Sequence, residues 1–273
     1  MGALNAVMNF AITKRLVPAS HRFEGRPKLK TMRRDEFTIE EYRKLHSVGR
    51  KWIRAATTPQ GIWYRTMCYN FMLIMCNTGM RPPEAKNLRW RDITLAKDRD
   101  GREIVVMFVQ GKGKSRKLVA PKSVGEYLAR VRELSKATTP DDSVFTIING
   151  KAAKYLYSDT VQDMLTESGL RMGPNGIARS TYCFRHTYAT FRLSEGVDVY
   201  ILAEQMGTSV KMIEQHYGHV NTIKHADRVL MGMTGWELIR KPGDDSEAAA
   251  KAAKAAASRD SAGRSRVPRT ARR

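Results

Sequence analysis

The chain has 273 residues, of which 42% are hydrophobic, enough for a sizeable core. Its 48 lysines and arginines outnumber its 27 aspartates and glutamates, and the resulting net charge of +21 favours a polyanionic partner, usually nucleic acid. A ribosomal or membrane-surface protein would share this charge, but no apolar run approaches the roughly 18–20 residues of a membrane span, and the N-terminus has no secretory pattern.

The N-terminal stretch "GALNAVMNFAITKRLVPAS" predicts a short amphipathic helix. With so little sequence around it, this helix is typical of the end of a larger unit, and we assign residues 1–24 to such a remnant. Residues 25–35 are polar and basic and contain a Gly-Arg-Pro step, which indicates a linker. The main domain is therefore expected over residues 36–240.

Helix signals open this domain. Thr38 followed by Glu41 is typical of a capping box at a helix start. A second, apolar helix is predicted over about 62–76, and Gly79 is placed to end it. The Pro82-Pro83 pair suits the first turn of the helix that follows.

A change of pattern then predicts strands. The runs "DITLA", "EIVVMFVQ" and "RKLVAP" are separated by turn-forming segments and indicate a three-stranded antiparallel meander. The helical period returns from Gly125, and residues 198–217 hold two short helices, capped by Asp198 and Ser209 with Gly207 between them. The predicted fold class is therefore α+β, mainly helical with a small sheet.

The C-terminal part contains one more predicted helix and a tail. The helix, at about 224–239, has an apolar face that includes Trp236. Residues 241–273 are low in apolar bulk and end in arginine, so we expect a disordered basic tail.

The three cysteines indicate a reducing compartment. They are odd in number and lie in apolar or helical contexts, at positions 68, 76 and 183. We interpret them as buried thiols of a cytoplasmic protein, because neither a disulfide framework nor a metal site fits this pattern.

Four polar residues stand at the edges of predicted elements. Arg81 begins a helix, with Glu84 one turn on, and Lys112 lies at the tip of the hairpin "VQGKGKSRK". Arg185 lies in the helix "YCFRHTYAT", and Tyr217 ends "KMIEQHY". Each alone has an ordinary explanation, such as a solvated arginine, a turn lysine or a half-buried tyrosine.

Together, these residues resemble the catalytic domain of the tyrosine recombinases, the phage-integrase family. The resemblance covers about residues 31–240, and the spacing from Arg185 to Tyr217 is as expected for the family. It implies the tyrosine-recombinase catalytic-domain fold and identifies residues 1–24 as the end of a preceding core-binding domain. The four matching blocks, in order, are "NTGMRPPEAKNLRWRDI", "FVQGKGKSRKLVAP", "YCFRHTYAT" and "IEQHYGHV".

The resemblance also implies the catalytic roles. Tyr217 is the nucleophile that holds a 3′-phosphate covalently, so no cofactor or metal is implied. Arg81 and Arg185 clamp the phosphate with bidentate donors, and Lys112 is the general acid for the departing 5′-oxygen. The neighbouring hairpin residues expected to contact DNA are Lys114, Arg116 and Lys117.

Two positions depart from the family pattern. Tyr182 stands where the family commonly has histidine, and Thr208 stands where it commonly has histidine or tryptophan. The hydroxyl groups of both residues can still donate to the scissile phosphate. Glu84, His186 and His219 are interpreted as residues that support the catalytic groups. His186 and His219 are also alternative candidates for the general base usually given to the first histidine.

The implied function is a site-specific DNA recombinase that integrates or excises a phage or mobile element in the cytoplasm of a bacterial host. Its implied partners are double-stranded DNA attachment sites, other protomers of a tetramer on DNA, and accessory DNA-bending or directionality factors. The helix at 224–239 is expected to dock on a neighbouring protomer. Two alternatives stay open: a non-catalytic helix-turn-helix regulator, which requires neither Arg81 nor Lys112, and a DNA-relaxing enzyme like the type IB topoisomerases.

Overall fold

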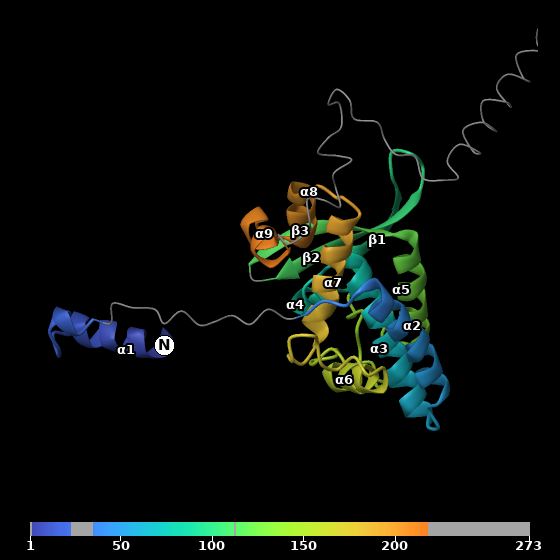
Figure 1. Ribbon diagram of the computed structural model, residues 1–273, viewed down its shortest axis with the longest axis horizontal. Coiled ribbons are helices and arrows are strands. Elements are labelled where there is room, and N and C mark those ends of the chain that lie inside the picture. The colour runs from blue at the N-terminus through green and yellow to red at the C-terminus, as the bar shows by residue number, and fades with distance from the viewer. Residues whose placement is uncertain (1, 23–34, 112, 218–273) are drawn as a thin grey trace, which may run out of the picture. The chain divides into compact units, whose positions relative to one another are not determined.

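The computed structural model of the protein describes residues 2–22, 35–111 and 113–217 (Figure 1). The first of these ranges holds helix α1 (Gly2–Thr13) and the 3-10 turn η1 (Ala19–His21), and it confirms the predicted N-terminal helix. The predicted helix at 224–239 and the tail lie outside the described residues. The assignment of residues 1–24 to a preceding domain stays a prediction.

Helix α2 (Ile39–Arg54) begins with the predicted capping box. The Glu41 backbone N–H donates to Thr38 Oγ1 at 3.1 Å, and the Thr38 N–H donates to a Glu41 carboxylate oxygen at 3.0 Å. Just before it, Asp35 is buried and accepts from the Asn175 backbone N–H at 3.1 Å, so the last residue of the predicted linker already contacts the folded domain.

Helix α3 (Pro59–Thr78) forms the centre of the core. Its second half is buried on every side, as expected for a helix that is apolar all round. It packs against α2, α5 (Lys122–Leu134), α6 (Ser158–Glu167) and α7 (Thr181–Ser194). The three cysteines are buried, and burial raises the pKa of the Cys68 and Cys76 thiols.

The predicted three-stranded meander is confirmed. Strands β1 (Ile93–Lys97), β2 (Glu103–Gly111) and β3 (Lys114–Pro121) pair antiparallel in the order β1-β2-β3. The last pair of the β2–β3 hairpin joins Gly111 to Lys114. Helix α4 (Pro82–Asn87) and the 3-10 turn η2 (Trp90–Asp92) connect α3 to this sheet.

A second, smaller core lies between α7, α8 (Val199–Met206) and α9 (Val210–Tyr217). Asp198 caps α8 as predicted, because its carboxylate accepts from the N–H groups of Tyr200 and Ile201. Gly207 ends α8 in the left-handed conformation and turns the chain into α9. Strand β3 lies beside α8 (Figure 1), which contacts it. None of the helices within these ranges is long and apolar enough to cross a bilayer.

Gly79 is predicted to be intolerant of alanine. Its φ of 64° is left-handed, and a Cβ there would overlap the Tyr188 ring. Gly79→Ala should lower the free energy of unfolding by about 1–2 kcal/mol for the backbone conformation and by about 1–3 kcal/mol more for overpacking. Urea unfolding of the full chain measures both.

Gly101→Ala is the matched control for this prediction. Gly101 is also left-handed, with a φ of 78°, but no atom lies within 4 Å of an added Cβ. This variant should show the backbone cost alone. Equal destabilisation by the two substitutions would contradict a packing role for Gly79.

Candidate active site

A cavity of about 590 Å³ lies where α4, the β2–β3 hairpin and the α8–α9 turn meet. These elements come from distant parts of the sequence, and the cavity contains several of the polar residues that the sequence analysis singled out. Its lining consists of Arg81, Glu84, Gly111, Ser115, Arg116, Ala203, Glu204, Gly207, Thr208 and Ser209.

Arg81 borders the cavity at the start of α4. Its backbone is extended, as expected for a residue that precedes proline. One terminal nitrogen donates to Glu84 Oε1 at 2.8 Å, and the other donates to the Gly207 carbonyl. The side chain is still 32% exposed, so the guanidinium is both held in place and accessible.

Glu84 is the buried anion of the site, and its side chain is only 2% exposed. Burial would raise its pKa, but hydrogen bonds from Arg116 and from the Arg81 backbone N–H, together with the charges of both arginines, outweigh burial and lower it. The carboxylate is therefore ionised near neutral pH.

Arg116 points inward from β3. Its two terminal nitrogens donate to the two oxygens of Glu84, at 2.5 and 2.9 Å, and its Nε donates to the Gln205 carbonyl at 3.0 Å. The side chain is 16% exposed. The basic hairpin sequence predicts a DNA contact for Arg116, whereas its guanidinium here binds groups of the protein.

Arg185 is 8% exposed and lies in the second turn of α7. One terminal nitrogen donates to the Gly79 carbonyl, and the other donates to the Met206 carbonyl at 2.8 Å. These carbonyls lie next to the turns that carry Arg81 and Thr208. Arg185 thus ties the end of α3 to the end of α8 behind the cavity.

The other predicted residues lie in different surroundings. Thr208 borders the cavity, whereas Tyr182 and His186 are half-buried on α7 and are not among the cavity-lining residues. Lys117 is exposed on β3. Lys114 begins β3 and Tyr217 ends α9, and only the backbone of each is described; Lys112 and His219 lie outside the described residues.

Comparison with known proteins decides the family. The model of the phage integrase family matches residues 39–223, which include every element around the cavity. The chain belongs to the phage integrase family. The resemblance to tyrosine recombinases and the expected catalytic-domain fold are thereby confirmed.

Relatives of this integrase-family chain include the tyrosine recombinase XerD of Rickettsia conorii and XerC of Oceanobacillus iheyensis. XerD is 24% identical, and the match covers 64% of this chain and 57% of XerD. XerC is 29% identical, and the match covers 66% of this chain and 55% of XerC. The chain thus spans little more than half of each relative.

Solved structures show the same fold. A XerH site-specific recombinase bound to difH substrate matches with a TM-score of 0.59 and 21% identity, over 83% of this chain and 62% of that one. A lambda integrase tetramer bound to a Holliday junction matches with a TM-score of 0.58 and 19% identity, over 79% of this chain and 57% of that one.

Four further polar residues of this integrase-family domain were not assigned to the site from the sequence. Ser115, Glu204 and Ser209 line the cavity, and Gln205 binds both Arg116 and β3. Only Ser209 carried a local signal, as the predicted cap of α9. The others resemble ordinary surface residues of a strand or a helix.

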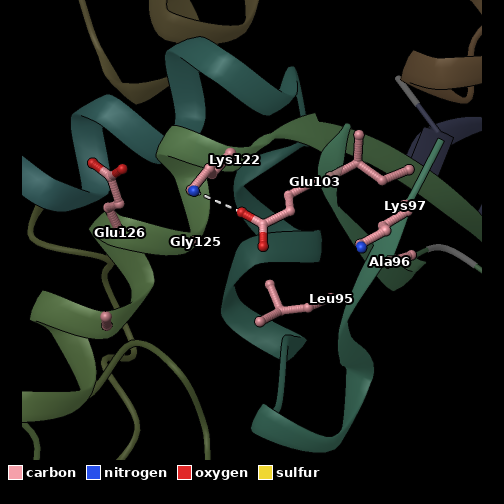
Figure 2. A pocket seen from close by; sticks show the side chains of 9 residues that line it. Leu95, Ala96, Lys97, Glu103, Lys122, Gly125 and Glu126 are labelled. Atoms are coloured by element: carbon pink, nitrogen blue, oxygen red, sulfur yellow. Dashed lines mark ion pairs between the residues drawn. The ribbon is translucent and has the colours of Figure 1, made fainter. Parts of the chain in front are cut away.

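A second cavity, of about 430 Å³, lies between β1, β2 and the start of α5 (Figure 2). Leu95 and Gly125 line it, and the Lys122 ammonium pairs with Glu103 at 2.6 Å across its rim. It contains none of the predicted catalytic residues. In the part of the chain that the structure describes, no group of three His, Cys, Asp or Glu side chains could hold a metal ion.

The lowered pKa of Glu84 predicts a pH-dependent contribution to stability. A carboxylate with a lowered pKa stabilises the fold fully above its unfolded value, and this stabilisation is lost as the pH falls through the folded value. Glu84→Gln should therefore lower the free energy of unfolding by about 1–3 kcal/mol at pH 7 and by less in acid. Urea unfolding from pH 7 down to pH 3 measures this difference.

Glu126→Gln is the control for the loss of one carboxylate, since Glu126 is exposed on α5. It should leave stability at pH 7 within about 0.5 kcal/mol of the wild type. If Glu84→Gln changed stability equally at pH 7 and pH 3, Glu84 would not be a stabilising anion.

Proposed function

We propose that this protein is a site-specific DNA recombinase that cleaves and rejoins DNA through a 3′-phosphotyrosine intermediate, and thereby integrates or excises a phage or mobile element. One observation carries the proposal: Arg81 and Arg185 both bind backbone carbonyls at the C-terminal end of α8, and Tyr217 ends the helix that follows. Two guanidinium groups and a tyrosine are the parts that phosphodiester transfer requires.

The proposed reaction conserves the phosphate ester. The Tyr217 hydroxyl passes its proton to a general base, for which His186 and His219 are the candidates, and its oxygen attacks the phosphorus while the bond to the 5′-oxygen breaks. The 5′-oxygen takes up a proton from Lys112, and the 3′-phosphate remains bonded to the tyrosine. Attack by a 5′-hydroxyl of another strand reverses these steps and joins the DNA without an external energy source.

The arginines are suited to the transition state because they are held before DNA binds. Arg81 is fixed by Glu84 and Gly207, and Arg185 by Gly79 and Met206. Donors that are already oriented stabilise the extra charge on the non-bridging oxygens without reorganisation.

Hydroxyl groups and lysines complete the proposed site. We assign to the Thr208 hydroxyl a hydrogen bond to a phosphate oxygen, and the position of Thr208 at the edge of the cavity supports this role. We assign the same role to Tyr182 and supporting roles to His186 and His219. Lys114 and Lys117 are assigned to DNA backbone contacts on the hairpin.

The proposed partners are double-stranded attachment sites and further protomers in a tetramer on DNA, with the helix at 224–239 docking in trans. Accessory DNA-bending or directionality factors complete the assembly. The lambda integrase and XerH structures, which are described as DNA complexes, support the choice of partner. The bacterial relatives support action in a bacterial cytoplasm.

A suicide-substrate assay with the full chain tests this function. A duplex from the attachment site, nicked so that the 5′-hydroxyl fragment diffuses away, should accumulate a covalent adduct that survives denaturation. Binding without an adduct would favour the helix-turn-helix regulator. An adduct without recombinant joints between two duplexes would favour the relaxing enzyme.

A further inference from the structure

The guanidinium of Arg116 and the side chain of Gln205 join β3 to the end of α8. We propose that Arg116 and Gln205 are positioning residues of the active site, which hold Glu84, and through it Arg81, in fixed register with the α8–α9 turn and strand β3. This inference rests on the proposed function, since it concerns the same site.

All three nitrogens of the Arg116 guanidinium have acceptors within the protein. The two terminal nitrogens form a bidentate pair with Glu84, and Nε binds the Gln205 carbonyl at 3.0 Å. Glu84 also accepts from the Arg81 backbone N–H at 2.7 Å and from its side chain at 2.8 Å. The carboxylate is therefore held by four donors, and its position determines the position of Arg81.

Gly207 lies between the two arginines. Its carbonyl accepts from Arg81, and a Cβ at this residue would lie 2.6 Å from an Arg116 terminal nitrogen. Gly207 has a φ of 61° and is followed by Thr208 and then by α9, which ends at Tyr217. A shift of Arg116 would therefore reach both the phosphate-binding side and the nucleophile side of the site.

The Gln205 side chain binds the backbone of β3. Its side-chain oxygen accepts from the Val119 N–H at 3.1 Å, and its amide nitrogen donates to the Val119 carbonyl at 2.7 Å. One side chain thus satisfies the edge of β3 as a neighbouring strand would. Arg116 pairs with Val109, two positions before the Gly111–Lys114 pair, so its contacts hold β3 close to the hairpin turn. Val119 pairs with Val106 further along the strands, so Gln205 holds β3 at a second point.

These contacts explain why Arg116 is not primarily a DNA contact. To reach a phosphate, its guanidinium would have to leave a carboxylate that is only 2% exposed, and removing one partner of a buried pair is unfavourable. Its charge is matched locally by Glu84. Substitutions should therefore change the cleavage step more than DNA affinity.

Two substitutions of Arg116 in the full chain test this inference. Arg116→Lys keeps the charge but loses the two parallel N–H donors of the guanidinium, and it should slow adduct formation at saturating suicide substrate by up to about 100-fold. Arg116→Gln removes the charge, and it should slow the reaction similarly while the slope of log K against log salt stays unchanged. A lost phosphate contact would reduce that slope by about 0.9.

The pH profile separates positioning from general loss of structure. In Arg116→Gln, Glu84 stays buried but loses its bidentate partner, so the acid limb of the adduct-formation rate should move to higher pH. Arg102→Lys is the matched control, because Arg102 pairs with Asp100 at the exposed turn of the same sheet, at 3.0 Å. It should keep the wild-type rate and profile.

Gln205→Ala provides an independent variant, because it leaves both arginines and Glu84 in place. It should slow adduct formation without moving the acid limb, and it decides the question if the Arg116 variants fail to fold. A wild-type rate in Arg116→Lys, or in Gln205→Ala, would overturn the inference. If the wild type itself forms no adduct, the proposed function is wrong and the inference falls with it.

Discussion

Tyr217→Phe is expected to abolish covalent adduct formation while leaving DNA affinity within about two-fold of the wild type. The substitution removes only the oxygen that would attack phosphorus, and Tyr217 is the one residue to which we assign that attack. The measurement is the yield of a denaturation-resistant adduct on the suicide duplex, with binding followed separately by gel shift.

Tyr200→Phe is the matched control for this result. Tyr200 lies on α8 and is 71% exposed, and it does not border the cavity. It should form adduct at the wild-type rate, and peptide mapping of the wild-type adduct should identify Tyr217. An adduct formed by Tyr217→Phe would refute the assignment of the nucleophile.

Arg81→Ala and Arg185→Ala should each reduce the rate of adduct formation by about 10²-fold or more, because each removes donors directed at developing charge. The two variants should differ in stability. Arg185 is buried and satisfies the carbonyls of Gly79 and Met206, so its loss should also lower the free energy of unfolding by about 1–3 kcal/mol. Single-turnover kinetics and urea unfolding measure the two effects.

Arg91→Ala controls for the loss of one arginine. Arg91 pairs with Asp141, and its side chain is 55% exposed, so the pair should contribute little. This variant should change neither the rate nor the stability appreciably. If Arg81→Ala cleaved as fast as Arg91→Ala, Arg81 would not act on the phosphate.

The local architecture of this protein follows from short stretches of sequence. Thr38 and Glu41 form the predicted capping box, and Gly79 ends α3 in the left-handed conformation. The three strands pair as the alternating runs and turn residues predict. These features depend on neighbours a few residues away, whose backbone preferences can be read directly from the sequence.

The four blocks of sequence also identified the family, since they name residue types and spacing that a phosphoryl-transfer site requires. The four blocks did not predict which groups their side chains contact. Arg116 lies between Lys114 and Lys117 in a basic hairpin, and its composition favours a DNA contact. Its guanidinium nevertheless lies on Glu84, because the hairpin folds against α4.

Only the tertiary structure decided how the site is held together. Arg116 and Glu84 are separated by 32 residues, Gln205 and Val119 by 86, and Arg185 and Gly79 by 106. No local preference encodes such pairs, because burial and hydrogen bonding between distant segments arise only when the segments pack. The sequence by itself determined which elements and which reactive groups this protein has. Packing of α4, β3 and α8 around a buried carboxylate decided that all three guanidinium nitrogens of Arg116 bind within the protein, while the Arg81 side chain stays 32% exposed.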